Sequence, residues 1–311
     1  MKINQIIQGD CLEVMKTLES ESIDCVITSP PYWGLRDYGV DGQLGLEKTP
    51  EEYVENLVNV FREVKRVLKK EGTLWLNLGD SYASKGKEGG DIDKDTGMDI
   101  ERGRGRLNDH QIIKPKDLVG IPWRVAFALQ ADGWYLRQDI IWHKPNPMPE
   151  SVTDRCTKSH EYIFLLAKSP KYYFNNEAIK EDSVDKESYT GRRKRHSYER
   201  YGEAGEGMAQ GFTDDNVVGK LYEKRNKRSV WTVTTKALKE AHFATFPEAL
   251  IEPMILAGCP KDGIVLDVFM GAGTTAVVAK KHGRNYLGIE LNAEYIKIAE
   301  KRINGTNNPL F

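Results

Sequence analysis

The chain has 311 residues, of which 40% are hydrophobic and 29% are charged, a balance that is typical of folded globular proteins and excludes a disordered or fibrous chain. Because 45 Lys and Arg residues stand against 46 Asp and Glu residues, the net charge of −1 excludes a protein that binds nucleic acid through its overall charge. No apolar run approaches the roughly 20 residues of a membrane helix, and the first residues lack the pattern of a signal peptide. We therefore expect a soluble, cytoplasmic protein without membrane association, in which a local basic patch binds any anionic partner.

Four cysteines lie far apart in the sequence, and no two of them form a Cys-x-x-Cys pair. This spacing favours neither a zinc cluster nor a disulfide framework, so we expect reduced thiols and no metal site. The four are Cys11, Cys25, Cys156 and Cys259.

The first half of the chain alternates between strand and helix patterns. Thr49 begins a capping box with Pro50 at the first helical position, and apolar residues follow at helical spacing in a helix that Gly72 ends. A segment at 84–109 interrupts the alternation, and because glycine is frequent there and apolar periodicity disappears, we expect a mobile loop. In chain order, the predicted elements are a strand at 3–8, a helix at 12–18, a strand at 24–28, a helix from Pro50 to Gly72, a strand at 73–78, a helix at 122–131, and strands at 135–142 and 162–167.

A polar segment at 169–235, rich in Arg and Tyr, separates this half from the last part of the chain, and we expect it to be an inserted module. Strand and helix patterns then alternate again. Because such alternation produces a parallel sheet with helices on both faces, we expect an α/β fold with a mainly parallel sheet. The predicted elements of the last part are a helix at 247–256, a strand at 263–268, a helix at 274–282, a strand at 286–289 and a helix at 293–304.

A glycine loop containing Gly271 and Gly273 follows a predicted strand and opens a predicted helix. Its glycines let a ligand approach the backbone and the start of the helix. Glu290 ends the next strand, where an acidic side chain can accept hydrogen bonds from both hydroxyls of a ribose. The loop alone also fits a nicotinamide oxidoreductase or a purely structural turn, but only 38 residues follow Gly273, too few to complete the nucleotide-binding halves of an oxidoreductase.

The predicted strand at 24–28 runs into Ser29-Pro30-Pro31-Tyr32. Two consecutive prolines lack amide donors and cannot continue a central strand, so the chain leaves the sheet as a stiff loop that carries Tyr32 and Trp33. The tetrapeptide alone is also typical of an ordinary proline-rich turn. The presence of the glycine loop in the same chain argues against an ordinary proline-rich turn.

Together, the two loops resemble the catalytic and S-adenosylmethionine motifs of amino-methylating DNA methyltransferases. The segment from Thr28 to Tyr32 resembles the catalytic motif, and the segment from Asp267 to Thr275 resembles the cofactor motif. Because the catalytic motif comes first, the chain resembles the circularly permuted beta group of that family. The resemblance implies a Rossmann-like methyltransferase fold with a seven-stranded sheet and S-adenosylmethionine as the cofactor.

The resemblance also implies a division of the chain into a catalytic half at 1–168, a target-recognition region at 169–235 and a cofactor-binding half at 236–311. In the cofactor site, Asp10 would meet the adenine and Glu290 the ribose. The residues implied for this site are Asp10, Phe246, Pro247, Asp267, Phe269, Gly271, Gly273, Thr274, Thr275, Glu290 and Asn292. The residues implied for catalysis are Ser29, Pro30, Pro31 and Tyr32.

An exocyclic amine is a poor nucleophile because its lone pair is conjugated into the ring of the base, and acceptors around its hydrogens would make it more nucleophilic. The resemblance implies that the Ser29 side chain and the Pro30 carbonyl are these acceptors and that Tyr32 stacks on a flipped base. We expect Trp33 to pack the loop. Ring-carbon methylation would need a cysteine nucleophile, usually in a Pro-Cys pair, and the nearest sequence is the reversed Cys259-Pro260.

Serine at the first position of the catalytic motif resembles the N4-cytosine subgroup more than the N6-adenine subgroup. We therefore expect a site-specific DNA methyltransferase that acts on the N4 amino group of cytosine, and N6-adenine methylation on the same scaffold is the alternative. A nicotinamide oxidoreductase and a catalytically silent DNA-binding protein are the competitors from other classes. The first is disfavoured by the late position of the glycine loop, and the second by the presence of both motifs.

Residues 189–229 contain ten Lys and Arg against six Asp and Glu, a local charge of +4 in a chain of net −1. Such clusters, with tyrosines between them, have the composition for contacts with phosphates and guanine, although a solvated surface would look similar. We expect double-stranded DNA as partner, localisation with the nucleoid, and a monomer or homodimer. The resemblance to DNA methyltransferases also makes a cognate restriction endonuclease acting on the same site a possible partner. The candidate DNA-binding residues are Arg192, Arg193, Lys194, Arg195, Arg225, Lys227 and Arg228.

Overall fold

The structure is a computed structural model. It describes residues 2–35, 39–40, 42–83, 113–183, 223–235 and 246–306. The predicted mobile loop at 84–109 and the basic cluster at 192–195 lie outside these ranges.

The chain divides into two compact units. The larger unit comprises Met1–Ala178 and Arg228–Phe311, and the smaller unit comprises Ile179–Lys227. The smaller unit is therefore narrower than the inserted module expected at 169–235, because the segments at both ends of that module belong to the larger unit.

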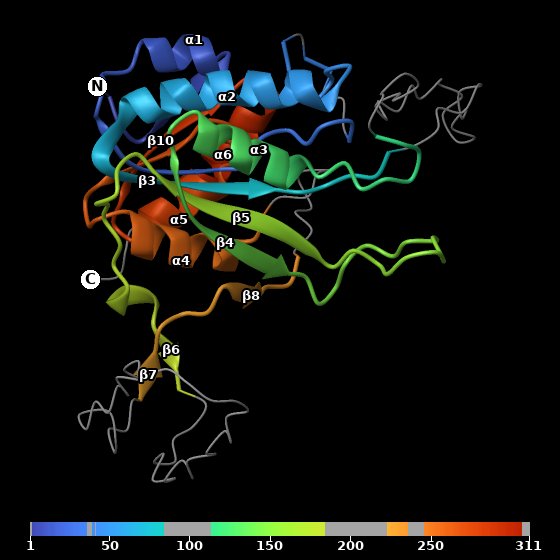
Figure 1. Ribbon diagram of the computed structural model, residues 1–311. Coiled ribbons are helices and arrows are strands. Elements are labelled where there is room, and N and C mark those ends of the chain that lie inside the picture. The colour runs from blue at the N-terminus through green and yellow to red at the C-terminus, as the bar shows by residue number, and fades with distance from the viewer. Residues whose placement is uncertain are drawn as a thin grey trace, which may run out of the picture. The chain divides into compact units, whose positions relative to one another are not determined.

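An eight-stranded sheet forms the centre of the larger unit, in the order β1-β10-β9-β2-β3-β5-β4-β8 (Figure 1). Every neighbouring pair is parallel except the two pairs that include β5, so the prediction of an α/β fold with a mainly parallel sheet is confirmed. The strands are β1 (Gln5–Gln8), β2 (Ile23–Thr28), β3 (Leu68–Leu78), β4 (Tyr135–His143), β5 (His160–Ala167), β8 (Val230–Thr232), β9 (Ile264–Asp267) and β10 (Asn285–Glu290).

The eighth strand is one more than the seven expected. Strand β8 has three residues and pairs with β4 through the register Ile141 to Val230. Its sequence lies within the segment that was expected to belong wholly to the inserted module. Three residues are too short a run to show the alternation by which a strand is recognised.

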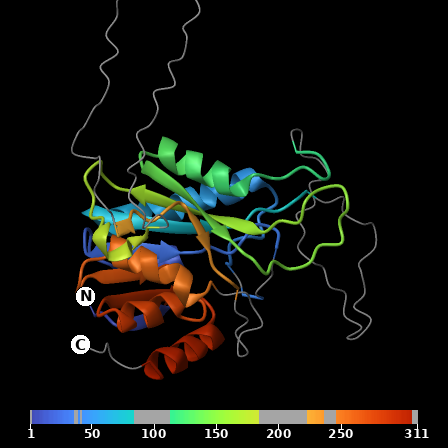
Figure 2. The same ribbon diagram turned by 90° about the horizontal axis from the view of Figure 1, so that it is seen from below.

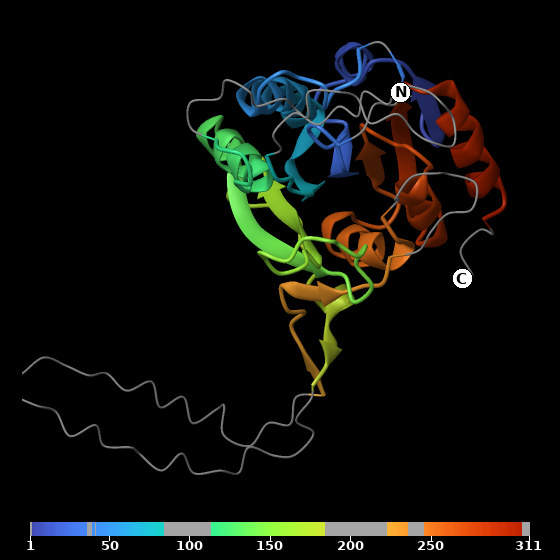
Figure 3. The same ribbon diagram turned by 90° about the vertical axis from the view of Figure 1, so that its right-hand side faces the viewer.

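Six helices cover the two faces of the sheet in the described part of this unit. In one layer, α2 packs against both α1 and α3, and in the other α5 packs against both α4 and α6. Figure 3 shows the two layers on opposite sides of the curved sheet, and Figure 2 looks onto the α4, α5 and α6 face. The helices are α1 (Cys11–Lys16), α2 (Pro50–Val67), α3 (Ile121–Ala131), α4 (Glu248–Gly258), α5 (Thr274–Lys281) and α6 (Ala293–Asn304).

The longest helix, α2, begins as its sequence predicts but ends earlier. The Thr49 hydroxyl accepts a hydrogen bond of 3.2 Å from the Glu52 amide, and the apolar face of α2 is buried against the sheet. The helix ends at Val67, not at Gly72, because Leu68 already pairs with Ile23 of β2. Gly72 lies inside β3. A Cβ atom there would come within 2.6 Å of the Leu68 side chain, so this position needs glycine because of close packing, and the glycine does not end a helix.

The smaller unit contains β6 (Glu181–Asp182) and β7 (Lys224–Arg225), which pair antiparallel. The 3-10 helix η1 (Glu177–Ile179) precedes them.

Within the residues that the structure describes, no helix is both long and apolar enough to span a membrane.

Candidate active site

The two loops singled out in the sequence leave neighbouring strands at the same edge of the sheet. Strands β2 and β9 run parallel, with Val26 opposite Leu266, and β10 lies on the other side of β9. The loop after β2 begins at Ser29, the glycine loop follows β9, and Glu290 ends β10. The carboxyl ends of adjacent parallel strands are where α/β proteins bind their ligands, and the fold brings the predicted residues together there.

Asp267 joins the two loops. Its buried carboxylate accepts hydrogen bonds of 2.7 Å from the hydroxyls of both Thr28 and Thr275, and one of 3.1 Å from the Phe269 amide. Burial raises the pKa of Asp267 to about 6 in spite of these bonds. Because Thr28 directly precedes Ser29, the Asp267 carboxylate fixes the loop that begins at Ser29 relative to the glycine loop. We call the loop that begins at Ser29 the catalytic loop.

The glycine loop requires its glycines for two different reasons. Gly271 and Gly273 have φ angles of 51° and 79°, a conformation that side chains disfavour. A Cβ atom at Gly273 would also come within 2.7 Å of the Ala299 Cβ on α6. Helix α5 begins directly after it, at Thr274, without a side-chain cap. The first turn of α5 therefore begins on left-handed, side-chain-free backbone, as a ligand-binding loop requires.

Glu290, at the end of β10, contacts the glycine loop through its side chain. Its two carboxylate oxygens accept hydrogen bonds from the Gly271 amide at 2.7 Å and from the Asn292 amide at 2.8 Å. Burial raises the pKa of Glu290 above its ordinary value. Each oxygen keeps a second lone pair, so the half-buried carboxylate can accept two further hydrogen bonds from a ligand.

Two more predicted cofactor residues lie beside Glu290 and cap helices. The Asp10 carboxylate accepts from the Glu13 amide at 3.1 Å and caps α1, and the Asn292 side chain accepts from the Glu294 amide at 2.9 Å and caps α6. Asp10 follows Gly9, whose amide donates to the Glu290 carbonyl at 3.0 Å. The structure thus brings Asp10, Asn292 and Glu290 to one edge.

Phe246 and Pro247 stand at the beginning of α4. Pro247 is buried and forms the N-cap of the helix, and Phe246 is half-buried. The helix packs on α5, β2 and β3. Their contact with a cofactor stays a prediction.

The catalytic loop is held from the side of α2. The Tyr53 hydroxyl on that helix donates to the Pro31 carbonyl at 2.8 Å, and Pro30 is buried. Trp33 is buried as well, and its indole N–H donates to the Glu47 carbonyl at 2.9 Å. Trp33 thus packs the loop, as expected.

The Tyr32 hydroxyl contacts two polar residues that the sequence analysis missed, Asn77 and Glu161, and a third missed residue, Lys144, pairs with Glu161. The hydroxyl donates to Glu161 Oε2 at 2.8 Å and accepts from Asn77 Nδ2 at 2.8 Å, and Asn77 Nδ2 also lies 3.0 Å from Glu161 Oε2. Ser29 Oγ lies 3.4 Å from both Tyr32 Oη and Asn77 Nδ2, and Lys144 forms an ion pair with Glu161 Oε1. The signal for two of them is a polar residue at the end of a buried strand: Asn77 interrupts an apolar run, and Glu161 begins one.

Burial, together with the charge of Glu161, holds the pKa of Tyr32 well above its ordinary value, so its phenol remains protonated near neutral pH. A neighbouring lysine, Lys158, donates to the Asp80 carbonyl at 3.0 Å, and burial lowers its pKa. The part of the site around the Tyr32 hydroxyl is therefore polar but mostly buried.

The structure describes three of the seven candidate DNA-binding residues. Arg225 belongs to β7 and lies 3.6 Å from the Glu181 carboxylate of β6. Lys227 is half-buried and Arg228 is exposed. The other four, at 192–195, fall outside the described residues, and a role in DNA binding stays a prediction for all seven.

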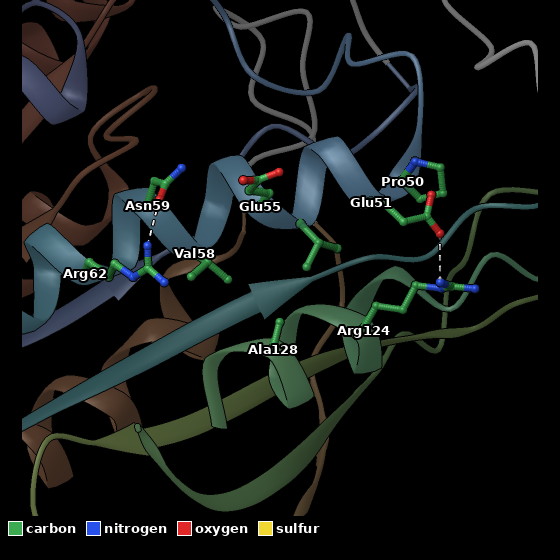
Figure 4. A pocket seen from close by; sticks show the side chains of 9 residues that line it. Pro50, Glu51, Glu55, Val58, Asn59, Arg62, Arg124 and Ala128 are labelled. Carbon is green, nitrogen blue, oxygen red and sulfur yellow. Dashed lines mark hydrogen bonds and ion pairs between the residues drawn. The ribbon is translucent and has the colours of Figure 1, made fainter. Parts of the chain in front are cut away.

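A surface groove lies elsewhere, between α2 and α3 (Figure 4). Figure 4 shows Arg62 turned towards Asn59, and Arg124 towards Glu51. None of the predicted catalytic or cofactor residues lines this groove. Its lining comprises Pro50, Glu51, Val54, Glu55, Val58, Asn59, Arg62, Arg124 and Ala128.

Comparison with known proteins relates the chain to enzymes that modify DNA. The model of the N6 and N4 methyltransferase family, described as DNA methylase, matches residues 23–301. The type II methyltransferase M.SmaI of Serratia marcescens is 47% identical over 302 residues, which cover 96% of this chain and 90% of that protein. M.Cfr9I of Citrobacter freundii, also a type II methyltransferase, is 46% identical over 303 residues, which cover 96% and 87%.

Solved structures share the fold at low sequence identity. The PvuII DNA methyltransferase, described as cytosine-N4-specific, superposes with a TM-score of 0.64 at 17% identity and covers 97% of this chain and 90% of its own. The protein TTHA0409 of Thermus thermophilus, complexed with S-adenosyl-L-methionine, gives 0.58 at 21% identity and covers 97% and 93%.

Proposed function

This chain belongs to the DNA methylase family, as its sequence motifs predicted, and we propose that it is a member that methylates the N4 amino group of cytosine at a specific DNA sequence. It is a DNA methyltransferase with a Rossmann-like α/β fold, and its cofactor is S-adenosylmethionine. The observation that carries the cytosine assignment is the hydroxyl of Ser29 at the head of the catalytic loop, held against the glycine loop by the bond between Thr28 and Asp267. The description of the PvuII enzyme as cytosine-N4-specific supports the same choice.

The residues at the edge of β9 and β10 fit S-adenosylmethionine. Glu290 has lone pairs for two ribose hydroxyls, and the left-handed glycines leave backbone approachable at the start of α5. Asp10 would meet the adenine, and Phe246 with Pro247 would lie beside the methionine moiety. When bound, the cofactor supplies a methyl group on a sulfonium, which is already a strong electrophile.

The protein therefore has to prepare the nucleophile. We assign the Ser29 hydroxyl and the Pro30 carbonyl as the acceptors for the two amino hydrogens of the target cytosine. The Thr28 to Asp267 bond and the Tyr53 to Pro31 bond hold this loop from both ends. A rigid pair of acceptors stabilises the developing positive charge on the amine without reorganisation during transfer.

Tyr32 would stack on the flipped base and replace the neighbours that the base loses when it leaves the duplex. In the structure its hydroxyl is tied to Asn77 and Glu161. A ring fixed at its far end can present a face to the base with little loss of side-chain entropy.

We further assign the segment at 169–235 to target recognition on double-stranded DNA, with its basic clusters on phosphates and guanines. A variant with Ala at Arg192, Arg193 and Arg195 should bind DNA more weakly and retain cofactor binding. Equal loss of both, or of neither, would contradict this assignment.

The relatives named as type II methyltransferases support a role in protecting a recognition site from a cognate restriction endonuclease. A DNA substrate also supports localisation with the nucleoid in the cytoplasm.

The proposal is tested by incubating unmethylated DNA of diverse sequence with the protein and S-adenosylmethionine carrying a labelled methyl group, and by chromatography of the resulting nucleosides. Label in N4-methylcytosine is the expected result. Label in N6-methyladenine would overturn the base assignment and retain the family, and label in 5-methylcytosine would contradict transfer to an amine.

A further inference from the structure

Glu161 lies outside both sequence motifs but contacts the catalytic loop. It is the second residue of β5, and the antiparallel pairing of β5 with β3 brings it to the same edge as Asn77. Its side chain is 15% exposed. One carboxylate oxygen accepts from Tyr32 and Asn77, and the other pairs with Lys144.

The contacts around Glu161 favour one arrangement of the hydrogens. A carboxylate can only accept, so the single hydroxyl hydrogen of Tyr32 is donated to Glu161, at 2.8 Å. Tyr32 Oη then only accepts. The two amide hydrogens of Asn77 serve its shorter contacts, 2.8 Å to Tyr32 and 3.0 Å to Glu161. The remaining neighbour of Tyr32 Oη, the Ser29 hydroxyl at 3.4 Å, must therefore be the donor in that contact.

This arrangement matters because a hydroxyl can donate as well as accept. A Ser29 hydrogen pointing at the target amine would bind the lone pair that has to attack the methyl group. Directed towards Tyr32, the same hydrogen leaves Ser29 Oγ able to accept one amino hydrogen, while the Pro30 carbonyl accepts the other. An aspartate at this position would need no such control, because its carboxylate carries no hydrogen when ionised.

We propose that Glu161 is a positioning residue that acts through the Tyr32 hydroxyl to hold Ser29 as a hydrogen-bond acceptor towards the target amine. The inference rests on the proposed function, in which Ser29 faces an exocyclic amino group. No proton is transferred along the chain; Glu161 fixes the direction in which the hydrogens of Tyr32 and Ser29 point.

The surroundings of Glu161 fit this role. Lys144 supplies a positive charge beside the carboxylate and also lies 4.2 Å from the centre of the Trp142 ring. Burial keeps the Tyr32 phenol protonated by raising its pKa, so it remains a donor. The 3.4 Å contact of Ser29 is long for a hydrogen bond between hydroxyls, and catalytic hydrogen bonds commonly tighten when substrate binds.

The test compares Glu161→Gln, Tyr32→Phe and the double variant in steady-state methylation of DNA. The side-chain amide introduced by Glu161→Gln can donate to Tyr32 and reverse the direction of the chain, and removal of the Tyr32 hydroxyl interrupts it. Each single variant should lose about 30-fold in kcat with KM for DNA and for S-adenosylmethionine within about threefold of the unchanged enzyme, because the acceptor acts in the transition state. The double variant should be no slower than the slower single variant, since one break already disconnects Ser29.

Glu150→Gln is the matched control. Like Glu161, Glu150 is partly buried, and it forms an ion pair of 2.6 Å with Arg155. It belongs to the loop between β4 and β5, and among the described residues it contacts none of the catalytic loop. We expect this variant to keep its kcat.

Two results would overturn the inference: kcat of Glu161→Gln within twofold of the unchanged enzyme, or a loss in the double variant equal to the product of the single losses. If Glu161→Gln does not fold, as thermal unfolding would show, then Tyr32→Phe decides, because it leaves the Glu161 to Lys144 pair intact. An unchanged enzyme that makes no N4-methylcytosine would overturn the proposed function. An enzyme that makes it and tolerates these variants would overturn only the role of Glu161.

Discussion

The two sides of the site are built in different ways. At the ends of β9 and β10, a backbone amide of the glycine loop donates a hydrogen bond to one carboxylate, from Gly271 to Glu290. Where β2, β3, β4 and β5 meet the same edge of the sheet, Ser29, Asn77 and Glu161 contact one hydroxyl, that of Tyr32, and Lys144 pairs with Glu161. We therefore expect substitutions on the cofactor side, at the ends of β9 and β10, to change cofactor binding and stability. Substitutions on the acceptor side, around Ser29 and Tyr32, should change turnover.

The largest expected effect is on the acceptor side. Tyr32→Ala removes both the stacking face and the hydroxyl to which Ser29 donates, and turnover should fall by about 100-fold or more. Cofactor affinity, measured by calorimetry, should stay within about threefold. Tyr135→Ala, at an exposed tyrosine at the opposite end of β4, is the control. Near-normal turnover of Tyr32→Ala would refute the stacking role.

The next effect is on the cofactor side. Glu290→Ala removes two charge-assisted acceptors for ribose hydroxyls, and we expect the Kd for S-adenosylmethionine to rise about 30-fold or more. Glu294→Ala, which removes an exposed carboxylate in the first turn of α6, should bind the cofactor normally. If both variants bind equally well, Glu290 does not hold the ribose.

Gly273→Ala should reduce stability. Its left-handed φ costs an alanine about 1–2 kcal/mol, and contact with Ala299 adds to this, so we expect a loss of about 3 kcal/mol in the free energy of unfolding. Gly42→Ala is the comparison, because its φ of 83° is similar but no atom of the described residues lies within 4 Å of a Cβ there. Urea unfolding of both variants measures the packing contribution. Equal losses would show that the helix α6 contact contributes nothing.

The smallest effect is a pH dependence at Asp267, which links the two sides. Because the folded protein holds its pKa at about 6, above the ordinary value, the folded state binds this proton more tightly than the unfolded state. Its contribution to stability is therefore present at low pH and is lost as the pH rises through about 6. Relative to Asp267→Asn, the protein should lose about 2 kcal/mol between about pH 4.5 and pH 7. A pH-independent difference in urea unfolding would contradict the raised pKa.

The two sides of the site also differ in how far they could be predicted from sequence. Gly271, Gly273 and Glu290 stand in one contiguous βαβ unit, so their spacing suggests a nucleoside-binding loop, and the Ser29-Pro30-Pro31-Tyr32 motif was needed to suggest which cofactor. Asn77 and Glu161 come from strands that are far apart in sequence and adjacent only in the sheet, which no local pattern reveals. The helix end at Val67 was misjudged because strand pairing at Leu68 overrides the helical pattern. Asp267 was predicted beside the cofactor, which stays a prediction, and its hydrogen bonds to the buried Thr28 and Thr275 could not be predicted because Thr28 is far away in sequence.

Mass spectrometry of nucleosides from DNA treated with the unchanged protein and, in parallel, with Ser29→Ala tests the role of Ser29. We expect N4-methylcytosine from the unchanged protein and little or none from the variant, although the variant should still bind S-adenosylmethionine. Formation of N6-methyladenine alone, or equal amounts of N4-methylcytosine from both proteins, would contradict the central claim that Ser29 prepares a cytosine amine for methyl transfer.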